Sequence, residues 1–202
     1  MLVLASSSPR RRELLALAGF TFTVTPASIP EELRAEESAI AYVTRLAREK
    51  ASFVYEQRSS EDGDGVMVLG ADTTVVAADG QILEKPVDEA DAVRMLRLLS
   101  GTTHKVITGV AVISAAGVEV AAEVTYVSMV TLSDAEIAAY VRAGESMDKA
   151  GAYGIQGLAS RWVPRVHGCY FNVMGLPLAL VASMVEGTQA RLGQTLPETV
   201  KA

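Results

Sequence analysis

Cysteine and histidine are scarce in this sequence. Its 202 residues include one cysteine, Cys169, and two histidines, His104 and His167. A single cysteine excludes an intrachain disulfide and a CxxC zinc motif, and two histidines so far apart in the sequence argue against a histidine-based zinc site. The low cysteine content is typical of a reducing compartment, so we expect a cytoplasmic protein.

Positive charge is also in deficit. Eighteen lysine and arginine residues against 24 aspartate and glutamate residues give a net charge of −6, and no lysine-rich tail or block is present. An acidic protein lacks the broad positive field that neutralises nucleic-acid phosphates, so we expect no nucleic-acid partner. Any phosphate that it binds should be small and held in a local basic pocket.

No hydrophobic run is long enough for a membrane. The apolar start of the chain is too short for a signal peptide, and the arginines follow it instead of preceding it. The run from Val173 to Met184 is too short to span a bilayer and predicts a buried helix. We therefore expect no secretory signal and no membrane partner.

Half of the residues are apolar, and their arrangement along the sequence follows an α/β pattern. Short apolar or alternating runs predict strands, and apolar residues at helical spacing predict helices. Strands are expected at 2–5, 20–24, 66–69, 74–77, 106–114, 118–130 and 162–166, helices at 9–18, 36–56, 88–99, 133–142 and 175–185, and irregular segments at 28–34, 58–65 and 151–157. This order predicts a mixed β-sheet flanked by helices.

Several common catalytic patterns are missing. The sequence has no Gly-x-Ser-x-Gly, no Walker A motif and no Gly-x-Gly-x-x-Gly. His167 and Cys169 would share one strand face, as in a Cys–His hydrolase, but no acid near them would orient the histidine. A structural role for Cys169 is the better interpretation.

Two polar segments follow predicted strands. Ser6–Arg12 lies between a strand and a helix N-terminus, where free N–H groups, the helix dipole and three arginines would attract an anion. Gly70–Thr73 places Asp72 at the end of an apolar run, where it could bind a divalent metal or activate water. Taken singly, these segments are better explained by a capped helix with solvated arginines and by an aspartate that bonds its own backbone in a turn.

Two lysines and a glycine-rich segment add to this set. Lys85 precedes Pro86, which restricts its backbone to an extended form, and an aimed lysine can stabilise a phosphoryl oxygen. Lys50 lies on a predicted helix. Gln156, in the segment 148–157, could recognise a base edge with its donor and acceptor. The alternatives are surface lysines and a loop shaped by its glycines.

Together these segments resemble the Maf family of nucleotide pyrophosphatases, over residues 4 to about 178. The matching stretches are Leu-Ala-Ser-Ser-Ser-Pro-Arg-Arg from Leu4, Leu-Ala-Arg-Glu-Lys-Ala from Leu46, Leu-Gly-Ala-Asp-Thr from Leu69, Glu-Lys-Pro from Glu84, Leu-Ser-Gly-Thr-Thr-His from Leu99, Asp-Lys-Ala-Gly-Ala-Tyr-Gly-Ile-Gln-Gly from Asp148, and Val-Met-Gly-Leu-Pro from Val173. Each stretch alone is weak evidence, but the presence of all of them in this order makes the match specific.

The resemblance implies a fold of two lobes around a cleft and a metal-dependent cleavage between the α- and β-phosphates of a nucleoside triphosphate. By position in the motifs, Asp72 matches the proton acceptor of the family and is also a candidate metal ligand. The other matches are base selection by Arg10, Thr73 and Gln156, and phosphate binding by Ser6, Arg11, Lys50 and Lys85. The metal would be Mg²⁺ or Mn²⁺.

Thr73 and the run from Asp148 to Tyr153 resemble the branch of the family that prefers dTTP and UTP. The sequence departs from the family in one place, because a common acidic pair is replaced by Pro30-Glu31. Glu31 would then be the remaining acidic residue and a candidate metal ligand. Whether Asp72 acts as the base or as a metal ligand stays open.

Two other functions remain compatible with the sequence: a 7-methyl-GTP pyrophosphatase of the same family, and a nucleotide-binding regulator of cell division or septum formation with little turnover. The expected partner is a small nucleotide, and the resemblance leaves a homodimer open. We expect residues 1–187 to form a single catalytic domain of two closely packed lobes, followed by a tail at 188–202.

Overall fold

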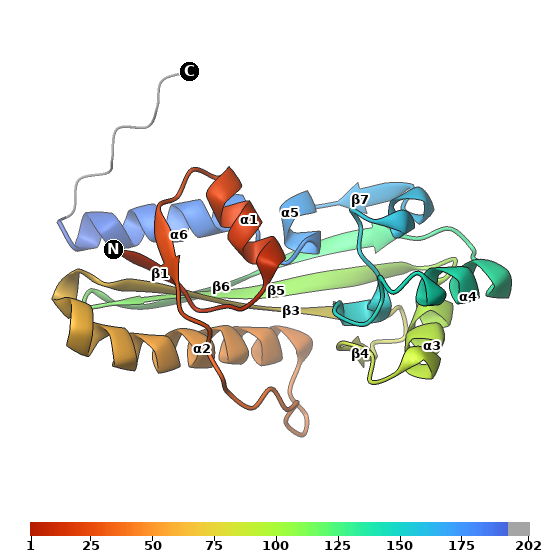
Figure 1. Ribbon diagram of the computed structural model, residues 1–202, viewed down its shortest axis with the longest axis horizontal. Coiled ribbons are helices and arrows are strands. Elements are labelled where there is room, and N and C mark those ends of the chain that lie inside the picture. Colours follow the sequence, from red (N-terminus) through yellow and green to blue (C-terminus); the bar gives the residue numbers. More distant parts are fainter. Residues whose placement is uncertain (194–202) are drawn as a thin grey trace, which may run out of the picture.

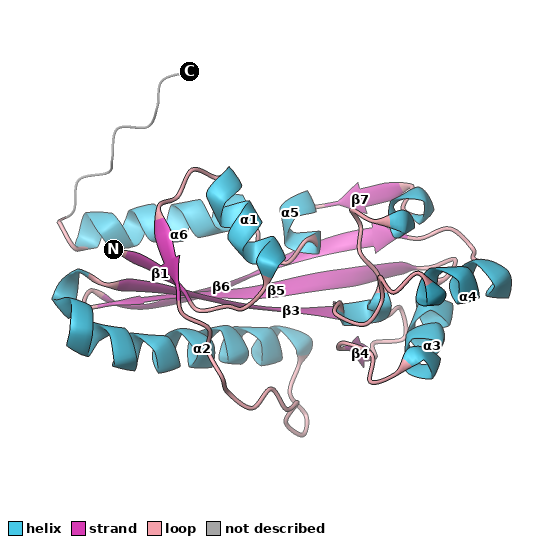
Figure 2. Cartoon of the chain, viewed as in Figure 1, coloured by secondary structure: helices cyan, strands magenta, loops and turns pink. Residues whose placement is uncertain are grey.

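The computed structural model describes residues 1–193 of the chain. Strands and helices alternate in its first half, and a long antiparallel hairpin follows them (Figures 1 and 2). The elements are β1 (Leu2–Leu4), α1 (Pro9–Leu17), β2 (Phe22–Val24), α2 (Ala39–Asp62), β3 (Met67–Val76), β4 (Ile82–Leu83), α3 (Glu89–Leu99), β5 (Thr103–Ser114), β6 (Gly117–Ser128), α4 (Asp134–Arg142), β7 (Arg165–His167), α5 (Tyr170–Val173) and α6 (Leu178–Arg191), with short 3₁₀ turns η1 (Gly63–Gly65), η2 (Ala150–Ala152) and η3 (Leu158–Trp162).

The sheet has seven strands, in the order β2-β1-β3-β5-β6-β7, and β4 pairs with β3. β1 runs parallel to both β2 and β3, whereas every other pairing is antiparallel. This mixed sheet with flanking helices confirms the fold class predicted from the sequence.

Side-chain alternation along the strands assigns each face of the sheet to different helices. Leu69 and Ala71 of β3 belong to the apolar cluster that includes residues of α1 and α6. Val68, which precedes Leu69, belongs instead to a cluster with the apolar residues of α2. Figure 1 shows α1 and α6 over one face and α2 along the other. Successive β3 residues therefore point to opposite layers.

A separate apolar cluster lies at the other end of the long strands. It joins α3 and α4 to the far ends of β3, β5 and β6. It also contains the buried Trp162, whose ring centroid lies 4.9 Å from the ring centroid of Tyr140. In Figure 1, α3 and α4 lie at the opposite end of the sheet from β1 and β2. The apolar core is thus divided between clusters at the two ends of the sheet.

Helix starts follow simple capping chemistry. The side chains of Ser8, Ser38, Asp88 and Ser133 accept a hydrogen bond from the backbone N–H three residues later, which satisfies one free donor of α1, α2, α3 and α4. Ser133 and Glu136 form a reciprocal capping box, in which the Glu136 side chain also accepts from the backbone N–H of Ser133. Among residues 1–193, no helix has both the length and the apolar character needed to cross a membrane.

Helix α2 lies unusually close to the sheet because two glycines face it. A Cβ atom on Gly70 of β3 would lie 2.2 Å from the carbonyl oxygen of Ala47, and a Cβ atom on Gly109 of β5 would lie 2.3 Å from that of Val43. Only glycine allows a helix backbone to approach a strand this closely. The contact fixes the height of α2 above β3.

The structure corrects two boundaries around this contact. Residues 58–65 were expected to form a loop, but α2 continues to Asp62, and Ser60 donates to the carbonyl of Gln57 within the helix. The strands expected at 66–69 and 74–77 are one strand, β3, because its pairing with β5 continues without a break from Met67 to Val76.

The C-terminal part also differs in detail. The strand expected at 162–166 is β7, Arg165–His167, and Trp162 ends a 3₁₀ turn instead. The last helix begins at Leu178, after Pro177, and continues to Arg191. Thr188, placed in the tail by sequence, is buried in this helix. The rest of the expected tail, from 194 onward, lies outside the described residues.

The glycine contact can be tested by Gly70→Ala. We expect the free energy of unfolding to fall by about 2 kcal/mol or more, because the new methyl group would overlap backbone atoms of α2. Chemical denaturation measures this change. Gly187→Ala is the matched control, since a Cβ there meets only Arg191 Nη1 at 3.7 Å inside α6. That variant should be as stable as the wild type or slightly more stable, and equal stability of both variants would contradict the packing argument.

Candidate active site

The edge of β3 has a gap in its strand pairing. On this side β1 pairs with Met67 to Leu69, and β4 pairs only with Val75 and Val76. The residues between, Gly70–Thr74, have no neighbouring strand there. The gap begins where β1 ends and the chain turns into α1, the kind of position where α/β sheets bind ligands.

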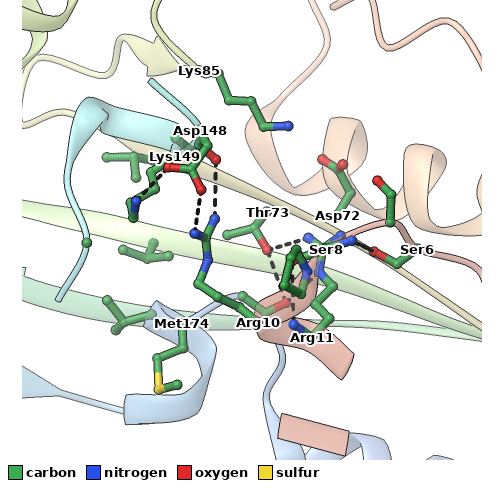
Figure 3. Close-up of a pocket in the computed structure, with 18 of the residues that line it drawn as sticks. Ser6, Ser8, Arg10, Arg11, Asp72, Thr73, Lys85, Asp148, Lys149 and Met174 are labelled. Atoms are coloured by element: carbon green, nitrogen blue, oxygen red, sulfur yellow. Dashed lines mark hydrogen bonds and ion pairs between the residues drawn. The ribbon is translucent and has the colours of Figure 1, made fainter. Parts of the chain in front are cut away.

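A pocket of about 320 Å³ lies at this gap. It is lined by β3, the segment between β1 and α1, α2, the residues after β4, and the segments 148–157 and 173–175. Every site residue predicted from the sequence lines it: Ser6, Arg10, Arg11, Glu31, Lys50, Asp72, Thr73, Lys85 and Gln156. Figure 3 shows several of them converging from separate elements.

Asp72 and Lys50 form the buried ion pair of the pocket. Lys50 Nζ of α2 lies 2.6 Å from Asp72 Oδ1 and 2.8 Å from Glu31 Oε1. Lys50 and Asp72 are only 7% and 5% exposed, whereas Glu31 lies at the exposed end of the group. The loop that contains Glu31 is held by a hydrogen bond from the Tyr42 hydroxyl to the Glu31 carbonyl.

The second carboxylate oxygen of Asp72 has no hydrogen-bond partner among the described residues, although it is buried. Burial raises the pKa of Asp72, and the positive charges of Lys50 and Arg11 oppose that rise. A buried acceptor without a partner is costly to a protein unless a ligand or water completes it. Oδ2 is therefore the atom of this pocket best suited to accept a proton or bind a cation.

Thr73 points to the opposite face and contacts Arg11 of α1. Arg11 Nη2 donates to Thr73 Oγ1 at 3.0 Å, and Arg11 Nε donates to the Gly175 carbonyl at 2.9 Å. A weaker bond of 3.4 Å joins Arg11 Nη1 to Ser6 Oγ. Arg11 thus links α1, β3 and the segment before α6, and it keeps few donors for a phosphate.

Arg10 crosses the pocket to the segment before η2. Its Nη1 donates to Asp148 Oδ2 at 2.8 Å, and its Nη2 donates to the Asp148 carbonyl at 3.2 Å (Figure 3). The side chains of Lys85 and Gln156 are exposed and make no hydrogen bond or ion pair with any other described residue. Their polar ends remain available to a ligand.

Comparison with known proteins decides the family. The model of the Maf-like protein family matches residues 1–188. The chain belongs to the Maf family. Its relatives include proteins named dTTP/UTP pyrophosphatase from Koribacter versatilis (52% identical, 91% of this chain and 92% of the relative), Hahella chejuensis (54%, 88% and 87%) and Geobacter sulfurreducens (53%, 89% and 92%). A solved dITP/XTP pyrophosphatase from Mycobacterium abscessus aligns over 96% of this chain and 98% of its own, with 13% identity and a TM-score of 0.40.

In this Maf protein, sequence reasoning missed three polar residues of the pocket. Glu84 accepts a hydrogen bond from Thr74 at 2.6 Å, and burial raises the pKa of its carboxyl group. Its place beside Lys85 was the available signal. Asp148 and Tyr153 lie in the segment that the sequence had singled out for Gln156. Their partners, Arg10 and His104, are distant in the sequence, so no local pattern marked them.

Tyr153 of the pocket wall is held by the buried His104. The Tyr153 hydroxyl and His104 Nε2 are 2.7 Å apart, and burial lowers the pKa of His104 to about 4 from 6.5. Folding therefore excludes a proton that the unfolded histidine accepts below pH 6.5. The stabilising effect is present above pH 6.5 and is lost as the pH falls towards 4.

We expect His104 to contribute about 3.5 kcal/mol to the pH dependence of unfolding across this window, because its pKa falls from 6.5 to about 4 and each pKa unit corresponds to about 1.4 kcal/mol. Denaturation midpoints measured between pH 7 and pH 4 should decrease as the pH is lowered in the wild type. In His104→Gln they should decrease less steeply. The exposed His167 gives the matched control, His167→Gln, which should keep the wild-type slope. The same slope in all three proteins would refute a neutral buried His104.

Proposed function

We propose that this protein hydrolyses dTTP and UTP, or a modified pyrimidine nucleotide, to the nucleoside monophosphate and pyrophosphate, with Asp72 as the proton acceptor. The names of relatives about 50% identical over most of the chain support the substrate class. The observation that supports the residue is the buried, unpartnered Oδ2 of Asp72 in a basic pocket. We further propose that residues 1–187 form one catalytic domain, that it acts in the cytoplasm, and that a homodimer is compatible with this activity.

In this mechanism Asp72 Oδ2 accepts a hydrogen bond from the attacking water and then its proton. Lys50 binds the other oxygen and fixes the plane of the carboxylate. The raised pKa of the buried carboxyl group makes it a stronger base than an exposed aspartate. The water oxygen forms a bond to the α-phosphorus as the bond between that phosphorus and the oxygen bridging to the β-phosphate breaks. Pyrophosphate leaves with the bridging oxygen.

The positive groups of the pocket stabilise the charge on the departing pyrophosphate. Lys85 has no partner in the described protein, so its ammonium group can turn to a phosphate oxygen without breaking an ion pair. Ser6 and the N-terminus of α1 add hydroxyl and backbone donors. Lys50 and Arg11 supply positive charge from fixed positions, since the protein already binds most of their donors.

A divalent metal, Mg²⁺ or Mn²⁺, fits this donor set. Among the side chains that the structure describes, no group of three acidic, histidine or cysteine residues is arranged to hold a metal by itself. Mg²⁺ is commonly bound by one or two carboxylates together with substrate phosphates. Glu31 would provide one such carboxylate, and Asp72 would provide the second in the alternative role in which Oδ2 binds the metal instead of accepting the proton of the water. When bound, the metal supplies positive charge to the phosphate oxygens.

The role of Asp72 predicts that Asp72→Asn loses at least about 100-fold in kcat, because an amide cannot accept the proton. Pyrophosphate release from UTP and dTTP with Mg²⁺ or Mn²⁺ measures this. Asp134→Asn, which changes an exposed aspartate of α4, is the control and should keep wild-type turnover. Thermal unfolding would check that both variants fold. Near-wild-type turnover by Asp72→Asn would refute the assignment.

Lys85→Ala should lower kcat/KM for UTP by about tenfold to 100-fold without lowering stability, since the side chain is exposed and unpaired. Lys105→Ala, at another exposed lysine, provides the comparison. An unchanged kcat/KM in Lys85→Ala would remove this lysine from phosphate binding.

The same assay across dTTP, UTP, CTP, GTP, ATP and 7-methyl-GTP distinguishes the proposal from its alternatives. Turnover confined to 7-methyl-GTP would assign the other branch of the family, and tight binding without turnover would favour a regulator. Arg10, Thr73 and Gln156 are proposed to select the base. Their variants should therefore change the order of substrates more than the highest kcat.

A further inference from the structure

The Arg10–Asp148 pair links two walls of the pocket. Arg10 lies in the first turn of α1, and Asp148 lies 138 residues later in the segment that also contains Gln156. Asp148 binds the guanidinium twice, through Oδ2 and through its backbone carbonyl. Without this partner the Arg10 side chain, 32% exposed, would be free to adopt many rotamers.

Asp148 is itself held in place. Lys149 Nζ donates to Asp148 Oδ1 and to the Glu145 carbonyl. Two residues after Lys149, the Gly151 N–H donates to the carbonyl of Glu84. Burial acts to raise the pKa of Asp148, but the hydrogen bonds from Lys149 and Arg10 outweigh it and lower the pKa to about 2, so the carboxylate stays charged at neutral pH. Arg10 is therefore anchored to a fixed segment.

The anchored guanidinium keeps free donors. A guanidinium group has five N–H donors, and the protein uses two of them, one on Nη1 and one on Nη2, which leaves three for a ligand. All of them are donors, and arginine stays charged, so this group can bind only acceptors.

Gln156 alone would distinguish pyrimidines poorly. Uracil and thymine present acceptor, donor, acceptor at O2, N3 and O4, whereas cytosine presents acceptor, acceptor, donor. A glutamine amide has both kinds of group and can turn over to match either pattern. A fixed group that only donates cannot adapt in this way, and it favours a carbonyl oxygen over an amino group.

We propose that Asp148 is a positioning residue for base selection: it holds the free donors of Arg10 where they meet the O4 carbonyl oxygen of uracil or thymine and exclude the 4-amino group of cytosine. The inference rests on the proposed function and adds to it the substrate feature that is recognised, the 2,4-dione edge. Asp148 acts through Arg10 and takes no part in the cleavage.

Asp148→Asn tests the proposal. Its kcat for UTP should stay within about twofold of the wild type, its KM for UTP should rise, and the ratio of kcat/KM for UTP to that for CTP should fall about fivefold, which is the scale of an exposed ion pair. Asp148→Glu should recover part of this ratio. Asp134→Asn, which weakens the exposed Arg97–Asp134 pair outside the pocket lining, should leave this ratio unchanged.

A double-mutant cycle separates positioning from a general structural effect. In an Arg10→Ala background, Asp148→Asn should cause no further loss of the UTP-to-CTP ratio, because the group that it positions is gone. An additive loss would overturn the proposal. An equal fall in kcat/KM for both nucleotides in Asp148→Asn, or an unchanged UTP-to-CTP ratio, would also overturn it. So would a rise in UTP turnover, which would show that the Arg10–Asp148 pair hinders substrate binding.

Binding keeps this test separate from the proposed activity. Affinities for UTP and CTP measured in the Asp72→Asn background, with and without Asp148→Asn, report base preference without turnover. A wild type that hydrolyses neither dTTP nor UTP would refute the proposed function. A UTP preference in binding that Asp148→Asn leaves intact would refute only the role of Asp148.

Discussion

The contact between the backbone of α2 and two glycines of the sheet determines the position of the site. Gly70 and Gly109 let the helix approach until its carbonyl groups occupy the space of the missing side chains. At that height Lys50 reaches Asp72, two residues beyond Gly70 on the same face of β3. An ordinary side chain at either glycine would raise the helix, and the lysine would then no longer lie against a buried carboxylate.

The pocket also depends on the alternation of β3. Asp72 and Thr73 are neighbours in sequence, but the strand directs them to opposite layers, where Asp72 binds Lys50 of α2 and Thr73 binds Arg11 of α1. Because β1 ends before this point and β4 pairs beyond it, both residues stay open to a ligand. The missing strand pairing at one edge thus leaves room for the pocket.

Much of this could be predicted from the sequence. Local patterns predicted the mixed α/β class and most helices. Capping residues such as Ser8 and Ser133 can be recognised locally because each binds the backbone N–H only three residues later. The motifs predicted the lining residues because nearly all of these residues lie in short segments that resemble one family. The continuity of β3 was missed, since it comes from pairing with β5, about 40 residues away. The partners Asp148 of Arg10 and Gly175 of Arg11 were missed for the same reason: they are contacts of the folded chain that no local pattern records.

The bond from Arg11 to the Gly175 carbonyl has a consequence for the order of assembly. It joins a side chain near the start of the chain to the segment just before the last helix. During synthesis the N-terminal strand and α1 emerge first, yet the Arg11 guanidinium gains this partner only after more than 160 further residues have been added. A nascent chain that already has Asp72, Lys50 and Lys85 therefore lacks this wall of the pocket, and the site becomes complete only after the segment before α6 has been synthesised.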